Sequence, residues 1–274
     1  MRKYKLTAVL IALLLIVVGC SKKDDAKVES NAGAEVLKLN VAASPSPHAV
    51  ILESIVDDLA AEGIELTITE FTDYVMPNTV VSQGEIEANY FQHGPYLDDF
   101  NDKNDTDLVS VGTVHIEPIA AYSNVLKNID ELSDGAAIAI PNDPTNGARA
   151  LLLLDANGII KLEDNTNPVA SVKEIIENPK NLEIVEAEAA QLPALLPDVE
   201  LAVINGNYAI GAGLNPVEDS LLIEGEDSFY TNIIAVKPEN AEDPRIKKLI
   251  EVIQSDSVKD FIAEEFKGAV IPAF

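Results

Sequence analysis

The segment from residue 37 to residue 69 changes from strand to helix and back to strand, and this order limits the folds open to the chain. Residues 37–41 alternate apolar and polar side chains, as in a half-buried strand. Apolar residues then recur at helical spacing between Pro47 and Gly63, and residues 64–69 alternate again. A β-α-β unit favours a parallel sheet with right-handed crossovers. The chain is therefore predicted to be an α/β protein.

The same alternation continues along the rest of the chain. We expect further strands at 108–114, 137–140, 201–204 and 233–236, and helices at 145–157, 246–253 and 258–266. In open parallel sheets, ligands bind beyond the carboxyl ends of the strands. The turns expected at such ends carry polar and aromatic residues, and they lie at 71–74, 89–93, 141–146 and 205–208. One cleft could collect these turns, although they come from distant parts of the chain.

The first twenty residues are predicted to be an export signal that ends at a lipidation site. Basic residues at 2, 3 and 5 precede an uncharged apolar run over 6–18, which is too short for a comfortable membrane span. Val17-Val18-Gly19-Cys20 resembles the bacterial lipobox, and Cys20 is the single cysteine of the chain. We expect a signal peptide at 1–19, lipid attachment to Cys20 and a flexible tether at 20–35. The alternative is an ordinary free cysteine in a secretory signal or membrane anchor.

The charge and cysteine content exclude several classes of protein. The chain has 46 acidic and 19 basic side chains, for a net charge of −27. A nucleic-acid binder needs a basic footprint, and so does a surface that binds anionic lipids. One cysteine excludes an internal disulfide and any multi-cysteine metal site. We interpret the many acidic residues as a solvated surface.

Motifs for catalysis or cofactor binding are absent from the sequence. It contains no G-x-S-x-G, H-E-x-x-H or Walker motif, and Gly211-Ala212-Gly213 lacks the rest of a dinucleotide fingerprint. His48, His93 and His115 are far apart in sequence and show no ligand-pair spacing. We therefore expect no catalytic residues, no cofactor and no metal, and an enzyme is the weaker interpretation.

Arg149 is the clearest candidate for contact with an anion. It lies one turn into the helix expected at 145–157, three residues after Asn146, so both side chains share one face. A helix N-terminus attracts anions, and a guanidinium can grip a carboxylate with two parallel hydrogen bonds. In so acidic a chain, the alternative is an ion pair with a nearby Asp or Glu. Chemistry alone does not decide between the two.

Tyr74, Phe91, His93 and Tyr96 form a second candidate group. Aromatic residues make up 5% of the chain, yet these four rings fall within residues 74–96, beside expected strand ends. Such rings can surround an apolar or thioether group, with sulfur–aromatic contacts worth about 0.3–1.5 kcal/mol. The alternative is that they belong to the local core.

Several segments of the chain, in this order, resemble the methionine-binding lipoproteins of ABC importers, the NlpA/MetQ family. They are PHAVILE (47–53), FTDYVMPN (71–78), GEIEANYFQHGPYLD (84–98), IAIPNDPTNGARALLLL (138–154), ENPKNLEIVE (177–186), LAVINGNYA (201–209), FYTNIIAV (229–236) and VIPAF (270–274). The match covers about residues 36–274, and the motifs FQH-x-PYLD and PNDPTN-x-x-RAL together make it highly specific. One mild departure is Ala121, where many members have glycine.

The resemblance implies a two-lobed periplasmic-binding-protein fold, type II-like, with two crossovers and a ligand cleft between the lobes. Lobe 1 is expected to comprise residues 36–121 plus 235–274, and lobe 2 residues 122–234. The crossings are expected near 119–123 and 230–234.

The resemblance also implies a ligand-binding site. Carried over by motif position, the family's binding residues are the ring set Tyr74, Phe91, His93 and Tyr96 around the thioether, Asn146 and Arg149 as a polar grip with Arg149 on the α-carboxylate, and Asn205 and Asn232 on the amino-acid backbone. Asn207 is a weaker candidate, because that position varies.

The implied function is a substrate-binding lipoprotein that captures L-methionine and delivers it to a membrane permease with a cytoplasmic ATPase. We expect a monomer that is lipid-anchored at the cell membrane and faces the extracytoplasmic side. A methionine dipeptide such as glycyl-methionine, or D-methionine, remains open as the ligand, because one sequence does not show pocket length or the contacts to the amine. A surface lipoprotein acting as an adhesin or antigen is the alternative from a different class.

Overall fold

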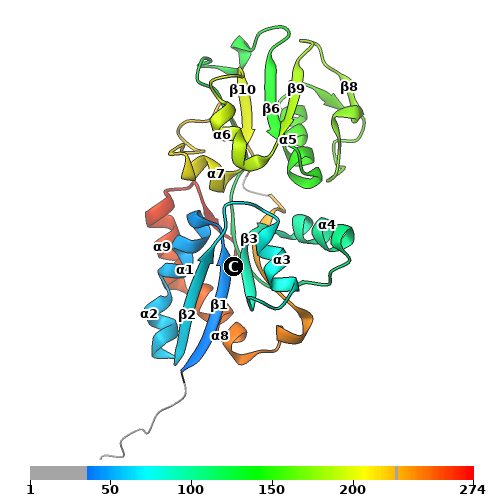
Figure 1. The fold of residues 1–274 in the computed structure, drawn as a ribbon. Helices are drawn as coiled ribbons and strands as arrows, with labels where there is room; N and C mark the ends of the chain where they lie inside the picture. The colour runs from blue at the N-terminus through cyan, green and yellow to red at the C-terminus, as the bar shows by residue number, and fades with distance from the viewer. Residues whose placement is uncertain (1–35, 226–227) are drawn as a thin grey trace, which may run out of the picture. The chain divides into compact units, whose positions relative to one another are not determined.

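The computed structural model describes residues 36–225 and 228–274. The predicted signal peptide and tether, including Cys20, lie outside these residues. Within them, the strands form two main sheets, each with helices on both faces (Figure 1). The protein therefore has the α/β fold that the β-α-β pattern predicted.

The first sheet has six strands in the order β13-β4-β12-β3-β1-β2. Their bounds are β1 Leu37–Ala43, β2 Ile64–Glu70, β3 Ala88–His93, β4 Val109–Ile116, β12 Thr231–Val236 and β13 Ile271–Pro272. Strand β1 pairs parallel with β2 and β3, whereas β12 runs antiparallel to β3 and β4. The β1–β2 pairing confirms the parallel unit predicted from residues 37–69.

The second sheet has five strands in the order β11-β5-β10-β6-β9. Their bounds are β5 Ala120–Tyr122, β6 Ala137–Pro141, β9 Glu183–Ala187, β10 Leu201–Ile204 and β11 Leu222–Ile223. Strands β6, β9 and β10 are parallel, and β5 is antiparallel to both β10 and β11. A separate two-stranded ribbon pairs β7 (Lys161–Leu162) with β8 (Ile175–Glu177).

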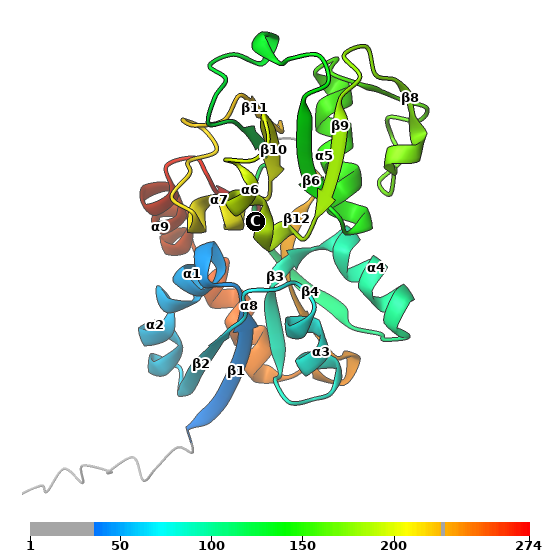
Figure 2. The same cartoon turned by 45° about the horizontal axis from the view of Figure 1, so that its top comes forward.

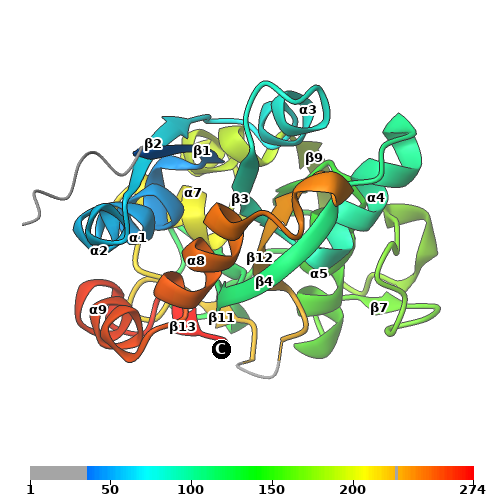
Figure 3. The same ribbon diagram turned by 90° about the horizontal axis from the view of Figure 1, so that it is seen from below.

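Helices pack on both faces of each sheet because successive strand residues point to opposite sides. One core of the first sheet includes α1 (Val50–Glu53), α2 (Val56–Ala61), α8 (Pro244–Ile253) and α9 (Asp256–Phe266), and the other includes α3 (Met76–Ser82) and α4 (Gly94–Asn104) (Figure 3). The second sheet packs against α5 (Pro144–Ala156) on one side and α6 (Leu192–Leu195) with α7 (Gly206–Gly211) on the other. In residues 36–225 and 228–274, none of the helices combines the length and apolar character of a membrane span.

Residues 89–93 were expected to form a turn, but they belong to strand β3, which is buried along its whole length. Its polar side chains hid the strand pattern in the sequence, because they form their hydrogen bonds with other buried side chains rather than with water. The side-chain nitrogens of Asn89 and Gln92 donate to Asn78 Oδ1 over 2.8 and 2.7 Å, and Asn78 Nδ2 donates to Gln92 Oε1 over 2.8 Å. Two buried amides of β3, bonded to Asn78 of α3, thus replace apolar residues that usually mark a central strand.

The helix expected between Pro47 and Gly63 is divided. A π-helical turn over Pro45–Ala49 leads into α1, and α1 and α2 are separated at Ser54 and Ile55. Ile55 has φ −111° and ψ 4°, outside helical values, and Ser54 Oγ donates to the carbonyl of Ile51 over 2.7 Å. A serine that bonds back to the preceding turn competes with the helical backbone pattern.

The chain passes between the two sheets at residues 117–119 and again between Ile223 and Thr231. Both passages begin before the expected crossings at 119–123 and 230–234. The reason is that β5 is already paired in the second sheet at Ala120, and β12 is paired in the first sheet at Thr231. We call the six-stranded sheet with its helices the first lobe, and the five-stranded sheet with its helices the second lobe.

Strand direction places the chemistry-bearing segments at two sheet edges. The carboxyl ends of β1, β2, β3 and β4 lie at one edge of the first sheet, together with the start of the antiparallel strand β12. The carboxyl ends of β6 and β10 share one edge of the second sheet, where α7 begins (Figure 2). Residues from both edges line one cavity.

Candidate ligand-binding site

All eight residues predicted to bind a ligand line one cavity. They are Tyr74, Phe91, His93, Tyr96, Asn146, Arg149, Asn205 and Asn232. The weaker candidate Asn207 is there too, and so are three residues outside the predicted set: Glu117, together with Gln92 and Gly206 from the segments 89–93 and 205–208. The structure thus brings the predicted set together, whereas the role of each residue toward a ligand stays a prediction.

Three aromatic rings form one wall of the cavity. Tyr74 follows β2, Phe91 lies on β3 and Tyr96 is in the first turn of α4. Their ring centroids are 6.0 Å apart for Tyr74 and Phe91, 5.7 Å for Tyr74 and Tyr96, and 6.0 Å for Phe91 and Tyr96. The Tyr96 hydroxyl donates to the Tyr74 carbonyl over 2.9 Å, which fixes the two rings relative to each other. The wall offers a rigid apolar surface next to the polar part of the site.

His93 joins this wall to the second lobe in a fixed tautomer. It is the N-cap of α4, and its Nδ1 accepts the Tyr96 backbone N–H over 3.2 Å. The proton is therefore on Nε2, which donates to Asn146 Oδ1 over 3.1 Å. Burial, together with the nearby charge of Arg149, lowers the pKa of His93 to about 3. The ring is neutral at physiological pH.

Asn146 uses both ends of its amide within the protein. Asp143 caps helix α5 and also accepts from Asn146 Nδ2, over 2.9 Å and 3.1 Å to its two oxygens. Asn146 Oδ1 accepts from His93 Nε2 and from Asn205 Nδ2, the latter over 2.7 Å. Asn146 thus orients two other cavity residues, His93 and Asn205, and its predicted grip on a ligand stays a prediction.

Asn205 presents an acceptor that the protein leaves unpaired. It follows β10 as the N-cap of α7 and is 6% exposed. Its Nδ2 is engaged by Asn146, but its buried Oδ1 has no hydrogen-bond partner within residues 36–225 and 228–274. Burying an unsatisfied acceptor costs about 1–3 kcal/mol. An acceptor in a cavity wall at that cost indicates a site for a ligand donor, such as an ammonium group.

Arg149 lines the cavity and is held by an ion pair, so the ion-pair interpretation is confirmed and contact with a ligand stays a prediction. Its Nε donates to Glu224 Oε1 over 2.9 Å, and Nη2 donates to Glu224 Oε2 and to the Glu117 carbonyl, the latter over 2.7 Å. Its Cζ lies 4.4 Å from the centroid of the Tyr230 ring. No partner for Nη1 is found in the part of the chain that the structure describes. A ligand carboxylate would therefore meet one nitrogen of Arg149 rather than the predicted two-bond grip.

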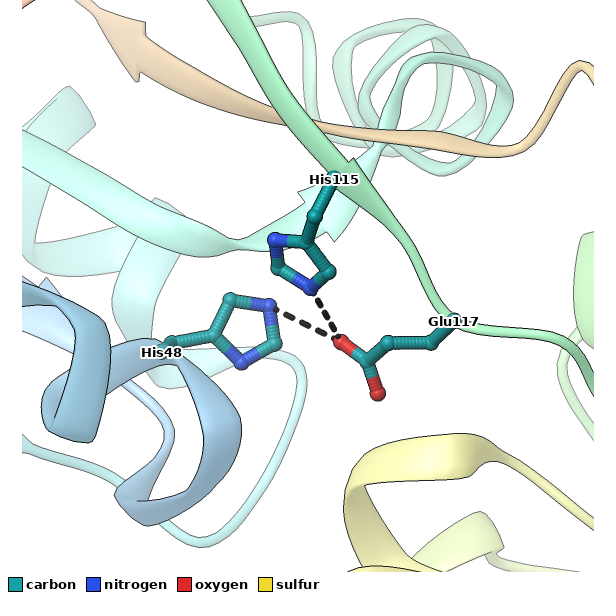
Figure 4. Close-up of side chains that lie close together, drawn as sticks. All are labelled: His48, His115 and Glu117. Atoms are coloured by element: carbon teal, nitrogen blue, oxygen red, sulfur yellow. Dashed lines mark hydrogen bonds and ion pairs between the residues drawn. The ribbon is translucent and has the colours of Figure 1, made fainter. Parts of the chain in front are cut away.

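Behind Asn232 lies a buried group formed by His48, His115 and Glu117 (Figure 4). Glu117 Oε1 is 2.8 Å from His115 Nε2 and 3.3 Å from His48 Nε2. His48 Nε2 is also 2.9 Å from Asn232 Oδ1, and the Tyr90 hydroxyl hydrogen-bonds to His115 Nδ1. Burial lowers the pKa of His48 to about 4 and that of His115 to about 3. Both rings are therefore neutral near pH 7.

The three side chains of this group are close enough to surround a metal ion, although its histidines show no ligand-pair spacing in the sequence. One ligand atom from each of His48, His115 and Glu117 lies within 4.8 Å of the others. However, each inward nitrogen is within hydrogen-bond range of the carboxylate or of Asn232, so donors and acceptors already match without an ion. Glu117 directly follows β4, and a polar residue at a strand's carboxyl end was the signal that could have identified it.

Comparison with known proteins places the chain in one family along nearly its whole described length. The sequence model of the NlpA lipoprotein family matches residues 39–274. The chain is 38% identical over 273 residues to the D-methionine-binding lipoprotein MetQ of Escherichia coli, covering 98% of each chain.

Solved structures show the same fold. A lipoprotein of Ruminococcus gnavus is 48% identical, with a TM-score of 0.85 over 86% of this chain and 99% of its own. A nutrient-binding protein of Burkholderia cenocepacia, solved with bound methionine, is 43% identical, with a TM-score of 0.82 over 87% of this chain and 100% of its own. The fold and the family match together lead to one conclusion: this chain is a member of the NlpA lipoprotein family.

Proposed function

We propose that this protein is the substrate-binding lipoprotein of an ABC importer and that its ligand is L-methionine. An α-amino acid needs an acceptor for its ammonium group, a donor for its carboxylate and a surface that matches its side chain. The cavity supplies the unpaired Asn205 Oδ1, the guanidinium of Arg149 and the ring wall. The unpaired buried acceptor beside an arginine is the observation that carries the proposal.

The ring wall favours an uncharged, flexible side chain. Phe91 and Tyr96 are buried, and Tyr74 packs against both. Burying a methionine-sized side chain contributes roughly 1.5–3 kcal/mol, whereas an uncompensated charge in the same place costs several. A thioether also makes favourable contacts with ring edges. Methionine is the amino acid that fits both conditions, and the names of the Escherichia coli and Burkholderia cenocepacia relatives agree with it.

Calorimetric titration of the ligand-free protein tests this function. L-Methionine is expected to bind, and glutamate and lysine are expected to bind at least about 100-fold more weakly, since several kcal/mol separate them. Comparable binding of glutamate or lysine would contradict the proposal. Tighter binding of D-methionine or of glycyl-methionine would keep the importer function and change the ligand, and mass spectrometry of the co-purified molecule provides an independent check.

We further propose that the protein is anchored through Cys20 and faces the extracytoplasmic side of the cell membrane. The support is the sequence Val17-Val18-Gly19-Cys20, together with family membership. Several acyl chains, at about 0.8 kcal/mol per buried methylene, give a stable anchor. Cys20→Ala is expected to move the protein out of the membrane fraction. A variant that fractionates like the parent would show that Cys20 does not carry the anchor.

We also propose that the protein acts as a monomer, with a membrane permease and its ATPase as partners. An adhesin or antigen needs no enclosed amino-acid site, so the unpaired Asn205 acceptor favours transport over that alternative. The proposal assigns the protein to ligand capture and delivery rather than to catalysis.

A further inference from the structure

We infer that His48 is a positioning residue for ligand recognition, because it fixes the side-chain amide of Asn232 so that the NH2 group faces the ligand. The inference rests on the proposed function for the nature of the ligand, an amino acid with a free carboxylate. His48 itself is 1% exposed and lies behind Asn232, in the π-helical turn that follows β1. It acts through Asn232 and does not line the cavity.

The first step is the position of the proton on His48. Its Nε2 faces two oxygens, Asn232 Oδ1 at 2.9 Å and Glu117 Oε1 at 3.3 Å. A bare nitrogen there would point its lone pair at both of these oxygens, so the proton belongs on Nε2. The outer nitrogen, Nδ1, is 3.0 Å from Ser44 Oγ, whose hydroxyl can donate to it. The neutral Nε2–H tautomer therefore satisfies every contact of the ring.

The second step is the orientation of Asn232. Its Oδ1 accepts the His48 proton, and an amide turned by 180° would place its NH2 group against that same N–H. The amide is thus locked with Nδ2 away from His48. Asn232 is 5% exposed and lines the cavity, and the described residues offer Nδ2 no partner. An unpaired donor is consequently available to a ligand acceptor.

Asn205 is oriented in the opposite sense. Asp143 fixes the amide of Asn146, whose Oδ1 then accepts from Asn205 Nδ2 over 2.7 Å. Asn205 therefore presents its oxygen, whereas Asn232 presents its nitrogen. Two asparagines of the same chemistry become an acceptor and a donor through their neighbours. This pair matches a zwitterion, with the ammonium group at Asn205 and the carboxylate shared by Asn232 and Arg149.

Glu117 holds the hydrogen-bonded pair of His48 and Asn232 in place. Its Oε1 accepts from His115 Nε2 over 2.8 Å while it faces His48, and the Tyr90 hydroxyl hydrogen-bonds to the other side of His115 (Figure 4). Glu117 is 5% exposed, and its Oε1 faces the Nε2 atoms of both His48 and His115. The group thus serves as a hydrogen-bonded support for Asn232, and a metal ion would require both inward protons to leave.

The test compares His48→Gln with His48→Leu by calorimetric titration with L-methionine. Glutamine can place an N–H close to the position of Nε2, whereas leucine fills similar space and donates nothing. We expect His48→Leu to weaken binding about 10- to 100-fold, the range for one hydrogen bond to a charged group. His48→Gln is expected to stay within about threefold of the parent, which is close to RT in free energy. Thermal unfolding without ligand checks that both variants fold.

A second measurement needs neither a variant nor a ligand. Nitrogen-15 NMR of the imidazole groups in the ligand-free parent should show His48 as the Nε2–H tautomer. The Nδ1–H tautomer would overturn the inference, and so would equal methionine affinities of the two variants or loss of binding on adding EDTA. If the parent fails to bind methionine while His48 is the Nε2–H tautomer, the proposed function fails but the orientation of Asn232 is supported.

Discussion

Arg149→Ala is expected to weaken methionine binding at least about tenfold and also to destabilise the ligand-free protein. The guanidinium is held by Glu224 and by the Glu117 carbonyl, and its Cζ lies 4.4 Å from the centroid of the Tyr230 ring. One charge-assisted hydrogen bond to the ligand contributes about 1.5–3 kcal/mol, and 1.4 kcal/mol is a factor of ten in affinity. The loss in stability has a separate cause, because Glu224, whose side chain is 16% exposed, would lose its partner.

Glu224→Gln is the matched control for that experiment. It removes the charge that opposes Arg149 but keeps an oxygen that can accept from the guanidinium, and the Glu117 carbonyl contact is retained. Methionine affinity should change far less than in Arg149→Ala. Calorimetry and thermal unfolding of both variants separate the two effects. If both variants lose affinity for methionine equally, Arg149 supports the segments that join the two lobes and does not contact the ligand.

The sequence predicted which residues line the site better than it predicted the hydrogen bonds between them. Motif resemblance selected eight of the twelve residues that line the cavity, although chemistry alone could not choose between ligand contact and ion pair for Arg149. The structure shows the ion pair, and its partner Glu224 comes just after β11, a two-residue strand that leaves no periodic pattern in the sequence; contact of Arg149 with a ligand stays a prediction. The opposite orientations of Asn205 and Asn232 depend on contacts across more than fifty positions of sequence. No local pattern encodes such contacts.

Long elements were predictable because one physical signal dominated each of them. The apolar helix expected at 145–157 is confirmed as α5, with Asp143 as its cap, and the apolar strand at 201–204 is confirmed as β10. Strand β3 was missed because buried amides satisfy one another there and replace the apolar pattern. Strands of two or three residues, such as β5 and β11, exist through pairing with distant neighbours. Sequence periodicity does not extend to pieces that short.

Helix α7 of the second lobe packs closely against Glu117, which directly follows β4 of the first lobe. One added methyl group should disturb this contact. A Cβ atom on Gly206 would lie 2.8 Å from Glu117 Cβ and 3.0 Å from Glu117 Oε2. Glu117 cannot easily give way, since its carboxylate is bonded to His115 and its carbonyl to Arg149. Overpacking of this kind costs about 1–3 kcal/mol. The second lobe should then be held slightly away from the first.

Gly206→Ala is accordingly expected to weaken methionine binding about 5- to 150-fold and to reduce the compaction that we expect ligand binding to produce in small-angle scattering. The reason is that binding needs residues of both lobes, and the added methyl group opposes their approach at α7. Gly211→Ala, in the same helix, is the control: its Cβ would have nothing within 4 Å. Alanine also favours a helix over glycine by about 1 kcal/mol, so this control should bind normally and be at least as stable as the parent. If Gly206→Ala binds and compacts like Gly211→Ala, the contact between α7 and Glu117 is not part of the ligand-bound arrangement.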